Sequence, residues 1–446
     1  MHHLVRSYII DSMGAEETLQ VATDAATVLA GCIAFEAQAV EQYQSNSDIK
    51  LYVLNVCNVL VVNGFAVSTL SDCDIVWRLA RVCSDAGYLI DIQPLVASAV
   101  STEEARGTKG DTDRKILATY RSSKLERKLG KYSGAKVKLT QLLKRIDSLR
   151  GSTTEPKLIL NARVRREIAN IEMREGNFTK AQDMLKNIPH NVYNSLTGTT
   201  FAVQHLSLRE LQAEIDGDME AMRDIRTKMA ADLREDHPYT IRAKSKLALL
   251  LGPTEKEQAV SLSREASETS MIRYGALYVG TVNAQVTYAR CLLQRGTPVD
   301  VLTASQLLLE MAASGIMSHF GEHSSEQLEF RYQCAKSAGM IAVSGSKQKK
   351  KAIEDLKTLR SEVSDLLGTK HPSVLRVTAT YALLLTESDK KTALSEIEEA
   401  CKLARDLPTA HRVADRVQDV RNMIVKGITA HEPVTYPGSA DWTAYL

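Results

Sequence analysis

The hydrophobic and polar positions between Asn161 and Pro189 follow the pattern of two amphipathic helices joined by a tight turn. Apolar residues recur at helical spacing in each half: Val164, Ile168 and Ile171, then Ala181, Met184, Leu185 and Ile188. Between the halves stand Gly176 and Asn177, which favour the left-handed backbone that ends helices. Pro189 cannot continue a helix because it lacks an N–H group. The segment therefore predicts a helical hairpin.

This hairpin pattern recurs along the chain from Lys115 onward. The second helix of each predicted hairpin carries one marker residue, usually a small one: Ala135, Ala181, Met222, Ala259, Ala304, Ala352 and Ala393. Successive markers are 46, 41, 37, 45, 48 and 41 residues apart. A regular period of about 40 residues is typical of helical-repeat arrays, in which stacked hairpins share one continuous core. The pattern predicts an all-α fold.

The motif Glu175–Ala181, EGNFTKA, followed by Leu185 and Pro189, resembles a tetratricopeptide (TPR) repeat. The small residues Ala169 and Ala181 occupy positions that let the two helices of such a repeat pack closely. Where the family has an aromatic residue three positions after the first of these, this chain has Glu172. The resemblance covers residues 115–405 and implies a right-handed α-α superhelix with a concave groove.

The segments that begin at His237-Pro238 and His371-Pro372 resemble the TPR variant found in kinesin light chains, where the same short segment caps the first helix. This resemblance is strongest over 234–405. It implies an adaptor or scaffold that holds a partner peptide or helix in the groove, and it implies no enzymatic activity.

Three regions are expected: an irregular acidic helical region over 1–105, the repeat array over 114–428, and a flexible tail over 429–446. The polar, glycine-containing segment Val100–Asp113 is predicted to be a linker or loop. Arg412–Ile428 is expected to form the last, capping helix.

Composition agrees with a helical protein of a reducing compartment. Hydrophobic residues make up 44% of the 446-residue chain and aromatic residues 5%, with few Gly and Pro. The 7 Cys include no CxxC pair, the N-terminus does not have the pattern of a signal peptide, and the apolar run 51–62 is too short to span a bilayer. We expect a cytoplasmic protein without membrane association; a nuclear location is also compatible.

Charge is unevenly distributed although the formal net charge is only +2. Residues 1–105 contain 4 Lys/Arg against 13 Asp/Glu, whereas residues 114–174 contain 17 against 5. A basic face on the first helices would bind an acidic peptide or helix of a partner. The residues predicted to contact it are Lys124, Arg127, Arg163, Arg166, Asn170 and Arg174, with Arg242, Asn283, Arg290 and Lys336 further along. The competing interpretation is a solvated basic face, or one docked against the acidic N-terminal region.

Two other functions remain open at this stage. The array could be a structural subunit of a large multiprotein complex, with permanent contacts on its outer surfaces. Alternatively, the basic segment 114–174 could bind nucleic acid through phosphate contacts. Single-strand binding usually also requires exposed aromatic side chains, and only Tyr120 and Tyr132 lie in that segment.

No motif for catalysis, cofactor binding or metal binding stands out. The sequence contains no P-loop, GxSxG or HExxH pattern, so we expect neither an enzyme nor a cofactor. His319 and His323 have the i, i+4 spacing of metal ligands, but Gly321 interrupts the helix and His323 occupies the capping position of its repeat. Lys347–Lys351, KQKKK, is predicted to be an exposed turn between two helices.

Overall fold

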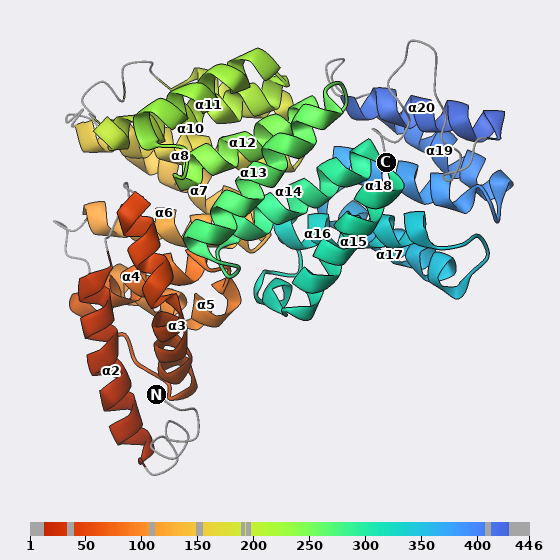
Figure 1. The fold of residues 1–446 in the computed structure, drawn as a ribbon. Helices are drawn as coiled ribbons and strands as arrows, with labels where there is room; N and C mark the ends of the chain where they lie inside the picture. The colour runs from red at the N-terminus through yellow and green to blue at the C-terminus, as the bar shows by residue number, and fades with distance from the viewer. Residues whose placement is uncertain are drawn as a thin grey trace. The chain divides into compact units, whose positions relative to one another are not determined.

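The computed structural model describes residues 13–33, 40–106, 112–148, 155–188, 192, 198–405 and 412–427. In this part of the chain, all regular elements are helical, nineteen α-helices and one 3-10 helix (Figure 1). The predicted all-α, helical-repeat class is therefore confirmed. The predicted tail, 429–446, lies outside the described residues.

The chain divides into two compact units. Unit 1 comprises Met1–Glu167, Arg273–Gly280 and Ser318–Ser324. Unit 2 comprises Ile168–Ile272, Thr281–Met317 and Ser325–Leu446.

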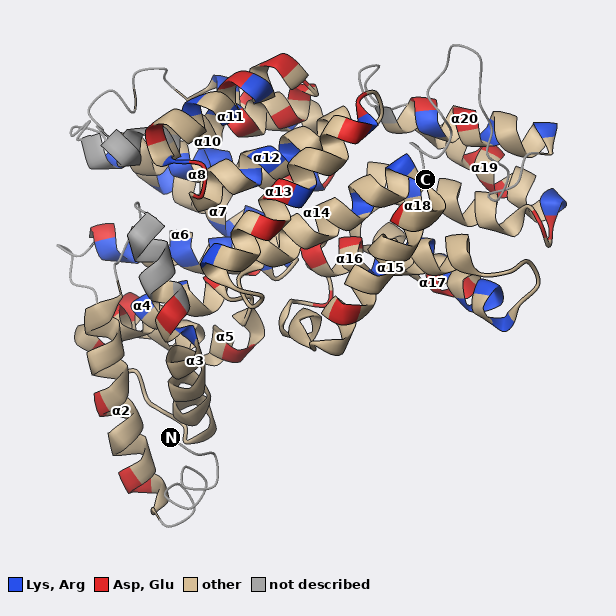
Figure 2. Cartoon of the chain, in the orientation of Figure 1, with Lys and Arg blue, Asp and Glu red and all other residues tan. Residues whose placement is uncertain are grey.

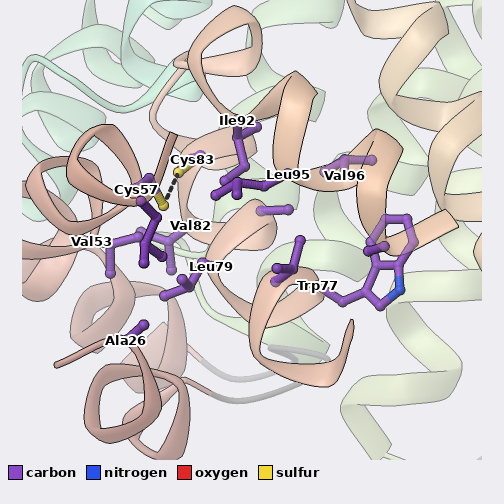
Figure 3. Close-up of a cluster of buried hydrophobic side chains, with 14 of the residues drawn as sticks. Ala26, Val53, Cys57, Trp77, Leu79, Val82, Cys83, Ile92, Leu95 and Val96 are labelled. Carbon is purple, nitrogen blue, oxygen red and sulfur yellow. Dashed lines mark hydrogen bonds between the residues drawn. The ribbon is translucent and has the colours of Figure 1, made fainter. Parts of the chain in front are cut away.

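Unit 1 is built from consecutive antiparallel helices. They are α2 (Ala15–Cys32), α3 (Val40–Val62), α4 (Leu70–Asp85), α5 (Leu89–Arg106), α6 (Thr112–Lys128), α7 (Tyr132–Ser148) and the first part of α8 (Glu155–Arg174). Helix α4 contacts α2, α3 and α5, and α5 contacts α6. Figure 3 shows the apolar side chains shared by the first four of these helices, among them Val53, Leu79 and Ile92, each fully buried. This common core holds the N-terminal helices together.

Unit 2 contains the end of α8 and the helices that follow. They are α9 (Phe178–Lys186), α10 (Gly198–Asp216), α11 (Met219–Leu233), α12 (Pro238–Leu251), α13 (Lys256–Tyr274), α14 (Val279–Arg295), α15 (Pro298–Ala313), η1 (Ile316–His319), α16 (Ser325–Ile341), α17 (Lys347–Leu367), α18 (Pro372–Leu385), α19 (Lys390–Ala404) and α20 (Arg412–Lys426). The end of α13, the start of α14 and the end of η1 belong to unit 1. The even-numbered helices from α8 to α18 are the first helices of their hairpins. Some of them also pack on one another: α10 on α12, α16 on α18, and α18 on the terminal helix α20.

The seven marker residues of the second helices are all in the core. Each is at most 1% exposed, including Met222, which takes the place of Ala on α11. A small side chain at this position lets the second helix of a hairpin pack closely against the first. A larger side chain would need space that the first helix occupies. The predicted hairpin period is therefore confirmed at every marker.

Two sequence expectations about loops need correction. The predicted linker Val100–Asp113 is helical at both ends, since α5 continues to Arg106 and α6 starts at Thr112, and its middle, residues 107–111, lies outside the described residues. The predicted turn Lys347–Lys351 forms the start of α17, with Ser346 as N-cap. In the first turn of α17, the side chain of Lys349 is buried and its ammonium group donates to the carbonyl oxygen of Gly339 at 3.0 Å. The long side chain of a lysine can donate to an open carbonyl group at the end of a neighbouring helix, and composition alone does not indicate this.

The predicted His-Pro caps are present on α12 and α18. His237 Nδ1 accepts from the backbone N–H of Tyr239 at 3.2 Å, and His371 Nδ1 accepts from that of Ser373 at 3.0 Å. Each histidine thereby satisfies an N–H group that the helix start leaves open. The third expected cap differs: α16 begins at Ser325, so His323 precedes the cap position and its side chain is exposed.

His371 also links two repeats that are distant in sequence. Because Nδ1 is an acceptor, the neutral ring carries its hydrogen on Nε2, which lies 2.5 Å from the carbonyl oxygen of Arg174 at the end of α8. Gly176 follows with φ of 78°, and a Cβ there would lie 3.2 Å from the His371 ring. The glycine thus allows both the turn and the close approach of the ring.

We predict that His371→Ala lowers the free energy of unfolding by about 1–3 kcal/mol, because it removes a helix cap and a buried hydrogen bond together. His323→Ala, at an exposed histidine, should change it by less than about 0.5 kcal/mol. Urea unfolding followed by circular dichroism measures both. Equal losses in the two variants would contradict the assigned role of His371.

Candidate functional site: basic residues on the first helices

All ten residues predicted to contact a partner lie on first helices. Lys124 and Arg127 are on α6; Arg163, Arg166, Asn170 and Arg174 on α8; Arg242 on α12; Asn283 and Arg290 on α14; and Lys336 on α16. Figure 2 shows Lys and Arg frequently along α8 and α12, whereas α2 carries acidic segments only. Contact of these residues with a partner stays a prediction, but the structure shows what several of them bind within the chain.

In unit 1, the basic residues surround Glu167 of α8. Its carboxylate is 3% exposed and accepts from Arg127 Nε at 2.7 Å, with Arg166 Nη2 at 3.9 Å. Burial alone would raise the pKa of Glu167, but Arg127, Lys124 and Arg166 lower it to about 2. Burial also lowers the pKa of Lys124 to about 8, which Glu167 partly offsets. The carboxylate therefore stays ionised and joins α6 to α8.

In unit 2, Glu210 of α10 plays the same part for α12. Its side chain is fully buried and accepts from Arg242 Nε at 2.9 Å and Lys246 Nζ at 3.1 Å. Arg242 also lies 4.5 Å from the ring centre of Tyr239. Burial alone would lower the pKa of Arg242, but the Glu210 carboxylate raises it above its ordinary value. Arg242 is thus engaged within the chain although its side chain is 44% exposed.

The third such carboxylate is Glu329 of α16, between α14 and α18. Arg376 forms a two-point ion pair with it, Arg290 Nη1 lies 3.5 Å from its Oε1, and Gln333 Nε2 donates to Oε1 at 2.7 Å. Burial alone would raise the pKa of Glu329, but Arg376 and Arg290 lower it to about 2. One carboxylate thus connects the first helices of three consecutive hairpins.

These three glutamates are the residues that sequence reasoning missed. Each immediately precedes an apolar residue that is buried on the same helix: Ile168, Leu211 or Phe330. A carboxylate next to a core position needs cationic partners. The placement of these glutamates directly before apolar residues could therefore have indicated ion pairs from the sequence alone. The basic residues Arg127, Arg242 and Arg290 are consequently ion-paired inside the chain, which neither the groove interpretation nor the solvated-face interpretation included.

The remaining predicted residues differ in exposure. On α8, Arg163, Arg166, Asn170 and Arg174 are half-buried, and Asn283 on α14 is exposed. Lys336 is 1% exposed. The structure therefore brings six of the predicted residues to three carboxylates: Lys124, Arg127 and Arg166 to Glu167, Arg242 to Glu210, and Arg290 and Lys336 to Glu329. Asn283 is accessible.

The two histidines with i, i+4 spacing have different surroundings. The His319 ring packs against Tyr88 with ring centres 3.9 Å apart and lies 3.4 Å from an oxygen of Asp91, while His323 is exposed. Within the described ranges, no group of three or more His, Cys, Asp or Glu could hold a metal ion. None of the described helices is both long enough and apolar enough to cross a membrane.

Comparison with known proteins gives similarity at the level of architecture. No protein-family model matches the chain, and no curated protein matches it in sequence. Among solved structures, the TPR domain of P58(IPK) aligns with 79% of this chain and 99% of its own, at 14% identity and a TM-score of 0.20. A circular tandem repeat protein aligns with 93% of this chain and 88% of its own, at 12% identity and a TM-score of 0.14. With such low TM-scores, the helical-repeat assignment depends on the hairpins of the chain itself.

We predict that acid destabilises this protein through Glu167 and Glu329. Their folded-state pKa values of about 2 lie below the ordinary 4.5, so their contribution is full above pH 4.5 and is lost as the pH falls towards 2. Each contributes about 3 kcal/mol at neutral pH.

The test is the urea midpoint of unfolding between pH 7 and pH 2.5. In a Glu167→Gln, Glu329→Gln variant the midpoint should be lower at pH 7 and fall less steeply with acid. A Glu362→Gln control, which removes a half-exposed partner of Arg331, should retain the full slope of the wild type. The account fails if the double variant loses stability as steeply as the wild type.

Proposed function

We propose that this chain is a non-enzymatic protein-interaction scaffold that binds an acidic peptide or helix of a partner along the first-helix faces of its repeats. The observation that carries this proposal is the placement of all ten candidate residues on first helices. Where first helices pack directly on one another, as α16 does on α18, their faces form a continuous surface. An extended partner segment could follow such a surface across several repeats.

The basic residues divide into two roles under this proposal. Arg127, Arg242 and Arg290 hold neighbouring helices in register through Glu167, Glu210 and Glu329. The half-buried cations of α8 and the exposed Asn283 are then the best candidates for contact with a partner. Charge complementarity would speed association with an acidic segment and select against basic ones.

We also infer that the repeats over 234–405 are of the kinesin-light-chain type. The support is the use of His237 and His371 as side-chain caps followed by Pro at the first helical position. A cytoplasmic or nuclear location fits a protein of this kind and is part of the proposal.

A structural subunit of a large complex is the second candidate, and α15 favours it. Val299, Leu302 and Leu309 lie on one side of this helix and are 71%, 58% and 64% exposed. An apolar stripe of this kind typically marks a surface that another protein covers. Nucleic-acid binding has less support, because Tyr120 and Tyr132 are buried and cannot stack on bases.

We predict that Arg163→Glu, Arg166→Glu, Arg174→Glu reduces capture of partners from cell extract by about tenfold or more, because it places negative charge on the α8 face. The matched control is Lys131→Glu, Lys144→Glu, Arg145→Glu, which makes the same charge change at exposed positions on or beside α7. Quantitative mass spectrometry of the captured proteins measures both, after circular dichroism has shown equal helicity.

Retention of the same partners by the α8 variant would contradict the proposed contact face. A matching loss in both variants would show that capture follows overall charge rather than this face. Partners that are lost instead on changing Leu302 and Leu309 to Lys would favour the complex-subunit function.

A further inference from the structure

A second basic group lies in unit 2 around the middle of α16. We call it the α16 cluster; its members are Arg290, Glu329, Gln333, Lys336, Arg376 and Arg416. They come from four alternate helices, the first helices α14, α16 and α18 and the terminal helix α20.

Positive charge exceeds negative charge in the α16 cluster. Arg290 and Arg376 both pair with the single carboxylate of Glu329, which also acts electrostatically on Lys336. Arg416 adds a fourth cation, whose Nη2 donates to the hydroxyls of Tyr332 at 3.2 Å and Thr380 at 3.3 Å. Buried charges of one sign are costly unless an anion neutralises them.

Lys336 is the residue of the α16 cluster whose positive charge is least compensated by neighbouring groups. The residue is 1% exposed, and no described residue forms a hydrogen bond or ion pair with its ammonium group. Burial lowers the pKa of Lys336 well below its usual value, and Arg416, Arg290 and Arg376 lower it further, against Glu329. A lysine in this environment is destabilising unless a ligand supplies acceptors.

Gln333, three residues before Lys336 on α16, has a polar atom without a hydrogen-bond partner. The residue is 1% exposed, its Nε2 donates to Glu329, and its Oε1 has no donor among the described residues. Exchanging the two amide atoms would place an oxygen against the carboxylate, so the hydrogen bond to Glu329 fixes the orientation. A ligand that satisfied both atoms would present an anionic group with an N–H or O–H donor beside it.

We propose that the α16 cluster is a binding site for a phosphate group. A phosphate brings close to two negative charges into a compact volume, which matches a surplus of at least two cations better than one carboxylate would. Guanidinium groups bind phosphate oxygens in a two-point manner, and the Arg290 side chain of the cluster is 24% exposed.

The chemistry fits a phosphorylated side chain of a partner segment, with its backbone N–H as the donor, or free hydrogen phosphate. Binding of a phosphorylated partner segment rests on the proposed scaffold function. Binding of inorganic phosphate to the chain does not depend on that function. The phosphate-site proposal and the scaffold proposal can therefore fail independently.

The test is isothermal titration of the purified full chain with inorganic phosphate at constant ionic strength, together with the Lys336→Met variant. This substitution replaces a buried cation by an apolar side chain of similar length. It should keep the fold and leave the melting temperature without phosphate unchanged or raised. Phosphate affinity should fall by about tenfold to a hundredfold, as expected for the loss of a hydrogen bond to a charged group.

The matched control is Arg331→Met on the same helix, where Arg331 pairs with Glu362 and lies outside the α16 cluster. Its phosphate affinity should stay within about twofold of the wild type. If Lys336→Met fails to fold, Arg290→Gln at the partly exposed edge of the cluster replaces it, with the same expected loss of affinity.

The proposal is overturned if the wild type does not bind phosphate saturably, or if Lys336→Met binds it as tightly as the wild type. Equal binding of succinate would also overturn it in favour of a carboxylate site. To separate the two sources, a short phosphoserine peptide is compared with its serine counterpart. Tighter binding of the phosphopeptide than of inorganic phosphate identifies a partner segment as the source, and equal binding identifies free phosphate.

Discussion

A carboxylate enclosed between first helices is the interaction on which the rest of this structure depends. Glu167 and Glu210 are buried, Glu329 is half-buried with 23% of its side chain exposed, and each lies beside a core position, where an unpaired charge is costly for the fold. Each is accompanied by an arginine from a neighbouring first helix. Because the pairing geometry is directional, it determines which helical faces meet and so complements apolar packing, which is not directional. Breaking such a pair by removing one partner is strongly destabilising, whereas the same pair contributes little as a mere surface contact.

The same residues limit what the basic faces can do. A cation that already neutralises a buried glutamate has less charge to offer a partner, and this applies to three of the predicted contact residues. In the α16 cluster, by contrast, the cations outnumber the single carboxylate of Glu329. Function in this chain is therefore expected where the internal pairing leaves positive charge over, rather than wherever Lys and Arg are frequent in the sequence.

Short-range features of the fold could be predicted from sequence, whereas pairings between repeats could not. The buried markers, the turn at Gly176 and the caps at His237 and His371 each depend on residues within a few positions of one another. The arginines that pair with Glu167, Glu210 and Glu329 from neighbouring helices are 32 to 47 residues away, so spacing alone does not select them. The continuation of helix α5 to Arg106 was not predicted. The helix contains Pro94, which leaves one backbone hydrogen bond unmade, and the burial of Ile92 and Ala99 on the same helix stabilises it.

The most direct test of this account is a double-mutant cycle between Glu329 and Arg376, using Glu329→Gln, Arg376→Gln and the combination. The free energies of unfolding should give a coupling of about 2 kcal/mol or more, because each single variant leaves a charge that is at most 23% exposed without its partner. A cycle between the half-exposed Arg331 and Glu362 serves as the reference and should give less than about 1 kcal/mol. A coupling for Glu329 and Arg376 no larger than this reference would contradict the claim that carboxylates enclosed between first helices hold the repeats in register.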